Sequence, residues 1–139
     1  MIYYLSLGAN LGEREQTLRR AMQRIEQQIG PILRCSSFYY SEPWGFDSPN
    51  PFCNLCCAVE TTIPPIEMLQ QTQAIERALG RTEKSENGHY ADRAIDIDII
   101  RAFEDDGKEI KVNEPSLQIP HPLWQQRDFV KVPLAEIMQ

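Results

Sequence analysis

Isoleucine and aspartate alternate in the stretch Ile95-Asp96-Ile97-Asp98-Ile99, and this pattern limits the local structure more than any other feature of the chain. β-Branched residues at every second position favour a strand, in which residues two apart share a face. Two carboxylates about 6.6 Å apart along a strand, at ~3.3 Å per residue, repel each other unless a cation lies between them. The stretch therefore predicts either a divalent-metal site or a half-exposed strand with an acidic outer face, and a lone D-x-D pair by itself favours the second.

The rest of the chain alternates strand-like and helix-like segments. Strand patterns cover residues 2–7, 32–41, 52–61 and the Ile/Asp stretch, and apolar residues at helical spacing run from Leu18 to Ile29 and from Met68 to Leu79. Asn10 is expected to cap the first helix, and Gly30-Pro31 and Gly80 are expected to end the two helices.

The order β-α-β-β-α-β predicts an α+β fold of the ferredoxin-like type, an antiparallel sheet with both helices on one face. The isoleucines of the Ile/Asp stretch then face the helices, and we expect the active site on the open face with Asp96 and Asp98. The tail is expected to add a short strand pair and then a loop, "IPHPLWQQRDFVKVPL", draped over the same region.

The chain is 139 residues long, and no linker or repeat divides it, so we expect a single domain over residues 1–139. A net charge of −6 argues against a general nucleic-acid binder. No apolar run approaches the ~18 residues of a membrane span, and the N-terminus lacks the pattern of a cleavable signal. We therefore expect a cytoplasmic protein without membrane or nucleic-acid partners.

Three cysteines crowd into the stretch Cys53-Asn54-Leu55-Cys56-Cys57. No second cysteine pair or histidine cluster completes a zinc site. The stretch also alternates as a strand does, so we expect buried thiols that pack as small hydrophobic side chains.

Cationic residues surround the aspartate pair in the sequence: Arg81, Lys84, Arg93, His121 and Arg127. Cations together with a metal-binding carboxylate pair are suited to a polyphosphate, because both neutralise its oxygens. There is no phosphate-binding loop of the G-x-x-x-x-G-K-[ST] type, and "GANLGE" is interpreted as a turn into a helix.

The segment "SEPWGF" and the following Phe52 and Asn54 offer aromatic faces near an amide, which is how proteins hold flat heterocycles. The alternative is that Trp44 and Phe46 only plug the edge of the core. Gln73 and Glu76 lie opposite the apolar face of the second helix, and by themselves they indicate a solvated surface.

Taken together, these motifs resemble those of the hydroxymethyldihydropterin pyrophosphokinases, enzymes of folate biosynthesis. The resemblance spans residues 2–137 and rests on "LSLGANLG", "SSFYYSEPWGF" with "FCNL", "QAIERALGR", "DRAIDIDII" and "IPHPLWQQRDFV". It implies transfer of the β,γ-pyrophosphoryl group of ATP to 6-hydroxymethyl-7,8-dihydropterin, with release of AMP. It also implies two magnesium ions, and we expect a monomer.

The resemblance carries roles over to individual positions. The catalytic positions are Arg81, Arg93, Asp96 and Asp98, of which Asp96 and Asp98 would bind the metal ions. The ATP-contacting positions are Gln73, Glu76, Lys84, Tyr90, Ile99, His121 and Arg127. The pterin-binding positions are Ser41, Glu42, Trp44, Phe52, Asn54, Tyr90 and Phe129. The chain departs from the family pattern at Glu83 and Ser116, where relatives often have arginine, and at Asp92, where proline is usual.

Two other classes of protein fit part of the pattern. A non-catalytic ferredoxin-like module could bind protein or RNA through its sheet, but RNA-binding sheets are basic where this one is acidic. Another two-metal phosphotransferase, such as a nuclease or nucleotidyl transferase, also uses paired carboxylates. The aromatic residues with Asn54 favour a small flat acceptor over a polymer.

Overall fold

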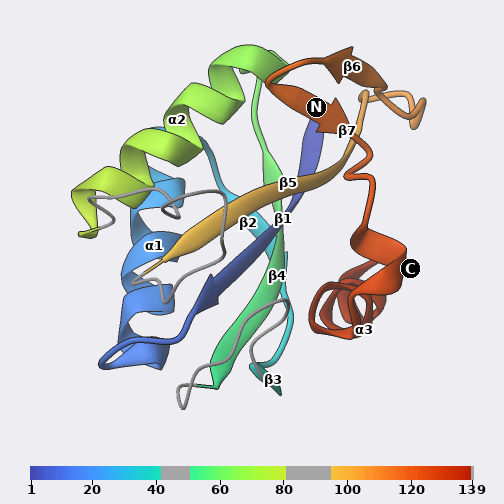
Figure 1. The fold of residues 1–139 in the computed structure, drawn as a ribbon. Coiled ribbons are helices and arrows are strands. Elements are labelled where there is room, and N and C mark those ends of the chain that lie inside the picture. The colour runs from blue at the N-terminus through green and yellow to red at the C-terminus, as the bar shows by residue number, and fades with distance from the viewer. Residues whose placement is uncertain (42–50, 81–94, 139) are drawn as a thin grey trace.

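The computed structural model describes residues 1–41, 51–80 and 95–138 (Figure 1). These residues contain a five-stranded sheet in which β2, β4, β1 and β5 follow one another and β3 pairs with β4. All the strand pairs of this sheet are antiparallel. The strands are β1 (Ile2–Ala9), β2 (Ile32–Cys35), β3 (Tyr39–Ser41), β4 (Phe52–Glu60) and β5 (Asp96–Phe103).

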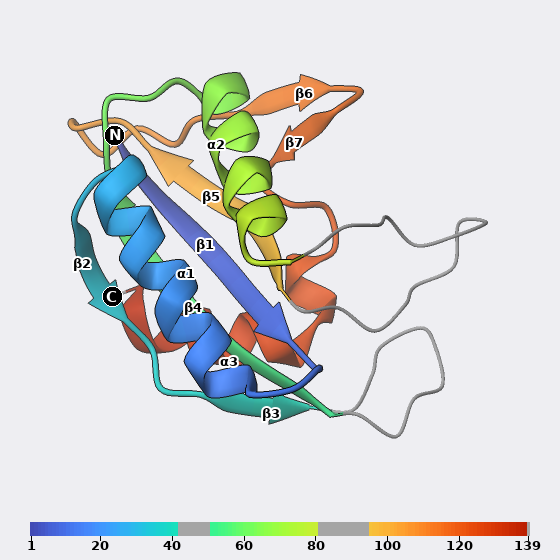
Figure 2. The same ribbon diagram turned by 90° about the vertical axis from the view of Figure 1, so that its left-hand side faces the viewer.

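Helices lie on both faces of this sheet. Figure 2 shows α1 (Arg14–Gln28) and α2 (Pro65–Ala78) in front of the sheet and α3 (Asp128–Ile137) behind it. Between β5 and α3 the chain forms a small hairpin of β6 (Val112–Glu114) and β7 (Leu117–Ile119), and then a 3₁₀ turn, η2 (Trp124–Gln126). No helix in the described ranges is long and apolar enough to cross a lipid bilayer.

The face under α1 and α2 holds the larger hydrophobic core. The predicted stripe of the first helix is confirmed, since Leu18, Ala21 and Ile25 are fully buried against the sheet. On α2, Met68 and Ile75 are buried in the same way. Alternation along β4 and β5 supplies the sheet side of this core, including Leu55, Cys57, Ile97 and Ile99. The expected direction of the isoleucines is therefore confirmed.

The second face is not free of helices, so the prediction that helices cover only one face is wrong. The stretch expected as a draped loop contains α3, whose Val130, Leu134 and Ile137 pack on β1, β4 and β5. The prolines of the tail suggested a loop, and Pro133 does lie inside this helix. An interior proline costs about 3 kcal/mol. Burying three large aliphatic side chains contributes roughly 1.5–3 kcal/mol each, which outweighs that cost.

Two local expectations also change. Asn10 does not cap α1, because Glu13 is at the N-cap position and Asn10 is buried after the end of β1. Gly12, with φ of +61°, makes the turn between them. The strand expected over residues 32–41 is two strands, because the Ser36 hydroxyl accepts a hydrogen bond from the Cys56 N–H at 2.9 Å and interrupts the ladder.

Candidate active site

The strand register brings residues from three distant segments into one row on the sheet face opposite α1 and α2. Gly8 of β1 lies directly opposite Asn54 of β4 on one side and Asp96 of β5 on the other. Directly opposite residues of antiparallel strands share a face. In the next row along the same face, Ser6 lies between Cys56 and Asp98. The structure thus places the predicted carboxylate pair beside the predicted pterin-binding amide.

The missing side chain of Gly8 leaves room for the Asn54 amide to lie over the backbone at the centre of this row. A Cβ atom at Gly8 would lie 2.7 Å from Asn54 Oδ1 and 3.6 Å from Phe52 Cδ1, and the first distance is too short for any real side chain. Sequence reasoning assigned this glycine to a turn and missed its role in the site. A glycine inside a strand often marks a close approach to a ligand or another backbone, and that signal was present in "LSLGAN".

Asn54 is held in one orientation although it is almost fully buried, with 3% of its surface exposed. Its Nδ2 donates to Ser41 Oγ at 2.9 Å and to the Tyr39 carbonyl at 3.4 Å. These two donations fix the direction of the amide, so that Oδ1 lies over Gly8 as an acceptor. Phe52, which is half-buried and opposite Ser41 in the β3–β4 pair, lies at the same end of the sheet.

His121 and Arg127 approach the row from the C-terminal tail. The His121 N–H donates to the Ile100 carbonyl at 2.8 Å, which attaches the tail to β5. Burial and the positive charge of Arg127 lower the pKa of His121, while Asp96 acts in the opposite direction. All three side chains therefore lie within electrostatic range of one another.

The tautomer of His121 follows from a hydrogen bond. Its Nδ1 accepts from the Leu123 N–H at 3.1 Å, so the neutral ring carries its proton on Nε2. The lowered pKa makes this neutral form, a hydrogen-bond donor at Nε2, the dominant one near neutral pH. The side chain of Arg127 is buried, and its guanidinium carbon lies 5.8 Å from the centre of the Phe129 ring. Phe129 is half-buried and also packs against the apolar cluster between α3 and the sheet.

Glu76 is not the solvated residue that its position on α2 suggests. Only 6% of its surface is exposed, and its Oε2 accepts a hydrogen bond of 2.7 Å from the Ile97 N–H. The expectation failed because helical periodicity does not reveal that β5 packs beside this turn of α2. Gln73, one turn earlier, is exposed as expected. The Ile99 side chain packs into the core between the sheet and the helices. An ATP contact at this position would therefore involve the backbone of Ile99.

Several expected site residues lie outside the described ranges: Glu42, Trp44, Arg81, Lys84, Tyr90 and Arg93. The same holds for the departures at Glu83 and Asp92, and for Phe46. Ser116 is described, and it is exposed in the turn between β6 and β7.

The donor set at the start of β5 fits a hard divalent cation. Magnesium prefers carboxylate oxygens and is usually held by one or two carboxylates together with substrate phosphates. Asp96 and Asp98 share a face, and the residue opposite Asp96 on β1 is Gly8, which has no side chain. Within the described ranges no group of three or more His, Cys, Asp or Glu side chains is placed to hold one ion. A pair of aspartates completed by a polyphosphate is consistent with both observations.

The cysteines have no such role in the described part of the chain. Cys53, Cys56 and Cys57 are fully buried, as predicted. Burial raises the pKa of Cys56 to about 12 and that of Cys57 well above its usual value, so neither is a thiolate at neutral pH.

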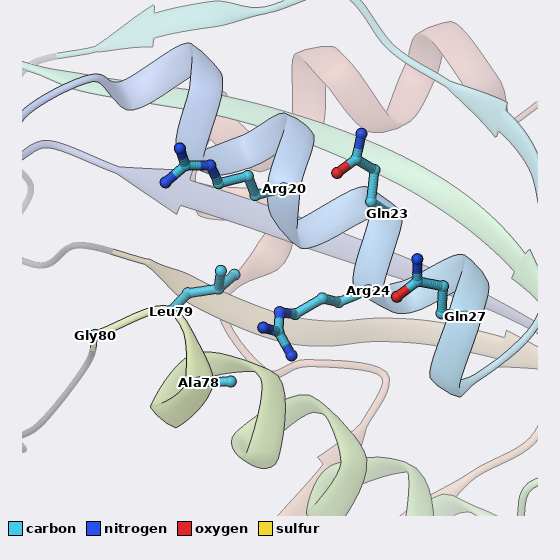
Figure 3. A pocket seen from close by; sticks show the side chains of 7 residues that line it. All are labelled: Arg20, Gln23, Arg24, Gln27, Ala78, Leu79 and Gly80. Atoms are coloured by element: carbon cyan, nitrogen blue, oxygen red, sulfur yellow. The ribbon is translucent and has the colours of Figure 1, made fainter.

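A separate groove of about 630 Å³ lies on the opposite side of the sheet, between α1 and the end of α2 (Figure 3). Its polar lining comes from Arg20, Gln23, Arg24 and Gln27. Figure 3 shows Arg24 extending toward the last turn of α2, the end of a helix that favours positive charge. Among the described residues that line the groove, none is a predicted site residue.

Paired carboxylates with cationic side chains, near an amide and aromatic rings, are the features expected of a metal-assisted phosphotransferase that acts on a small planar acceptor. Comparison with known proteins gives the particular family. The chain matches the 7,8-dihydro-6-hydroxymethylpterin-pyrophosphokinase family, HPPK, over residues 4–139, and it belongs to that family.

Two curated relatives carry the name 2-amino-4-hydroxy-6-hydroxymethyldihydropteridine pyrophosphokinase. The protein of Porphyromonas gingivalis is 48% identical over 136 residues, which cover 98% of this chain and 90% of the relative. That of Bacillus subtilis is 35% identical over 139 residues, which cover 99% of this chain and 78% of the relative. A crystal structure of an HPPK-DHPS protein in complex with substrates has the same fold, with a TM-score of 0.70 at 18% identity. The match covers 99% of this chain and 40% of that longer chain.

Proposed function

We propose that this protein transfers the pyrophosphoryl group of ATP to the hydroxymethyl oxygen of 6-hydroxymethyl-7,8-dihydropterin. The products are AMP and the pterin diphosphate, and the reaction is a step of folate biosynthesis. The observation that carries the proposal is the near full-length family match, and the row Asp96–Gly8–Asn54 gives it a physical basis. If Asp96 binds the polyphosphate and Asn54 binds the flat ring, the two substrates would lie near each other, as transfer between them requires.

Asp96 and Asp98 are the residues that would hold magnesium, and we propose two ions. Magnesium held there would supply positive charge that neutralises phosphate oxygens and makes the pterin hydroxyl easier to deprotonate. The two aspartates repel each other in the absence of a cation. Binding of a metal ion together with ATP would relieve this repulsion and so stabilise the site. In-line attack on the β-phosphorus then depends on how firmly β5 holds both carboxylates in place.

His121 and Arg127 are proposed to bind ATP. His121 supplies an Nε2–H donor, because its Nδ1 is used by the Leu123 N–H. Arg127 has a planar guanidinium suited to phosphate oxygens, and it lies close enough to His121 to lower the pKa of that ring. By the family resemblance, Gln73, Lys84 and the backbone of Ile99 are added to this binding site, and the loop residues Arg81 and Arg93 would neutralise charge during transfer.

The pterin ring is proposed to lie on the open end of the sheet face near Gly8. Asn54 Oδ1 accepts hydrogen bonds there, and a pterin edge carries N–H donors that suit it. Phe52 and Phe129 offer aromatic surfaces at that end and at the α3 border. Ser41 fixes Asn54 through its hydroxyl. By resemblance, Glu42, Trp44 and Tyr90 would complete the pocket.

The proposal includes the architecture around this site. The order β2-β4-β1-β5 with antiparallel pairs supports a ferredoxin-like topology, with the active site on the polar half of the face that α3 leaves uncovered. We further propose one functional domain over residues 1–139 that works as a monomer.

A product assay tests the proposal. The protein is mixed with ATP, magnesium and 6-hydroxymethyl-7,8-dihydropterin, and AMP is followed by chromatography beside a pterin-free control. AMP that forms only with pterin is the expected result. Pyrophosphate release would instead indicate a nucleotidyl transferase. Intact folding and ATP binding with no AMP would favour the non-catalytic binding module.

A further inference from the structure

Glu76 and the start of β5 form a connection that the transfer reaction described above does not use. β5 is the last strand of its sheet, and edge strands carry backbone groups without a neighbouring strand. The Ile97 N–H of β5 donates a hydrogen bond of 2.7 Å to the carboxylate of Glu76, which belongs to α2. Ile97 stands between Asp96 and Asp98 in the chain, so this bond fixes the backbone at the centre of the carboxylate pair.

We propose that Glu76 is a positioning residue, which holds the two metal-binding aspartates in register by anchoring the Ile97 amide. This inference rests on the proposed function, because it assigns Asp96 and Asp98 to the metal ions. It differs from a direct ATP contact, the role that family resemblance gave to this position. Glu76 has only 6% of its surface exposed, which leaves little of it to meet a ligand.

Charge explains why β5 needs such an anchor. Asp96 is the first residue of β5. When no metal ion is bound, the repulsion between the Asp96 and Asp98 carboxylates therefore acts on the end of an edge strand. A hydrogen bond from a backbone amide to an ionised carboxylate is among the stronger kinds in proteins. Glu76 comes from a helix that is itself fixed by Thr72 and Ile75, both fully buried on the same stretch of α2.

The arrangement also separates support from ligation. The structure places no group of three or more potential metal ligands together in the described ranges, so Glu76 does not join the two aspartates as a third ligand to one ion. Groups that orient metal ligands without touching the metal have measurable effects, and replacing them typically lowers metal affinity or activity ~10–100-fold.

The first readout is the Ile97 amide itself. Hydrogen exchange followed by NMR should show that Glu76→Ala speeds exchange at Ile97 by roughly tenfold or more, since the bond is lost. Glu76→Gln keeps an acceptor oxygen and should retain most of the protection. Glu67→Ala is the matched control, because Glu67 is an exposed carboxylate in the first turn of the same helix.

The second readout is metal affinity, measured by electron paramagnetic resonance with Mn²⁺ and a non-hydrolysable ATP analogue. Glu76→Ala should weaken Mn²⁺ binding by ~10-fold or more, and Glu76→Gln by much less. Wild-type exchange at Ile97 and wild-type Mn²⁺ affinity in Glu76→Ala, with only a higher KM for ATP, would overturn the proposal. If Glu76→Ala does not fold, Glu76→Gln decides: wild-type Ile97 protection together with a ~10-fold loss of Mn²⁺ affinity would show that the charge matters and not the hydrogen bond, and would overturn the proposal.

The two proposals fail in different ways. In one outcome, the wild-type protein forms no AMP, but Glu76→Ala still weakens Mn²⁺ binding and speeds exchange at Ile97. That outcome would disprove the assigned reaction and support the anchoring role. In the other outcome, the wild-type protein forms AMP, but Glu76→Ala leaves exchange at Ile97 unchanged. That outcome would support the assigned reaction and disprove the anchoring role.

Discussion

The two faces of the sheet are built from the same strands and serve different ends. Under α1 and α2, successive inward residues of β1, β4 and β5 are apolar and nearly all fully buried. On the opposite face, one half is apolar beneath α3, and the other half carries Asp96, Asp98 and Asn54. The comparison teaches that two neighbouring carboxylates can be held on one face of a strand because the other face of the same strand is anchored in a packed core.

Asp96→Ala should show the largest difference between the two faces, because it should nearly abolish activity and leave the fold intact. Loss of a metal ligand removes several kcal/mol of transition-state stabilisation, so AMP formation should fall by about a thousandfold. The fold should remain, because the change also removes a like-charge repulsion on β5. Turnover at saturating ATP and a thermal melt measure the two effects, and Asp106→Ala, in an exposed turn, is the control. Retained turnover in Asp96→Ala would disprove the metal assignment.

Leu5→Ala tests the other face. Leu5 is fully buried at the centre of β1 and belongs to the core under α1 and α2. A cavity there should lower the free energy of unfolding by about 2–5 kcal/mol, as measured by urea denaturation. Turnover of the folded protein should change little, because the side chain lies away from the carboxylates. Leu33→Ala, at an exposed position of β2, should cost less than about 0.5 kcal/mol. Parallel losses of stability and turnover in Leu5→Ala would contradict the division of roles.

The local pattern of the sequence was enough to predict one face and not the other. Alternation in β4 and β5 and helical spacing in α1 and α2 are local signals, and each correctly predicted which residues face the helical core. The helix at 128–137 was missed because a proline inside it is a local signal for a loop, while its burial depends on distant strands.

The site was predicted in part for the same reason. Asp96, Asp98 and Asn54 could be named from motifs, but their common row depends on register among β1, β4 and β5, which no local pattern contains. The burial of Glu76 likewise depends on the neighbouring edge of β5. Gly8 had a readable signal, a glycine within a strand-like run, and its interpretation as a turn was incomplete.

Gly8→Ala should sharpen the comparison within the polar half. The new methyl group would lie 2.7 Å from Asn54 Oδ1, so the amide must shift away from its bonds to Ser41 and Tyr39. We expect the KM for the pterin to rise by roughly tenfold, since about 1.4 kcal/mol corresponds to that factor, with ATP affinity nearly unchanged. Steady-state kinetics gives the KM for the pterin, and titration calorimetry with ATP in the absence of pterin gives the ATP affinity. Ser6→Ala, one row along β1, is the control, and a comparable loss of pterin binding there would indicate a general disturbance of the strand.

His121 gives the smallest expected effect, a dependence of stability on pH. Burial and Arg127 lower its pKa below the usual 6.5, so the unfolded chain binds the proton more readily than the folded protein does. The stability linked to His121 is therefore complete above pH 6.5, and it decreases as the pH falls below 6.5 toward the lowered value. NMR titration of the imidazole measures the pKa directly, with His121→Gln identifying the signal. Urea denaturation between pH 5 and pH 7.5 should show a flatter profile in that variant. A His121 pKa at or above 6.5 would mean that the negative charge of Asp96 outweighs burial and the positive charge of Arg127. It would contradict the arrangement of these three side chains described above.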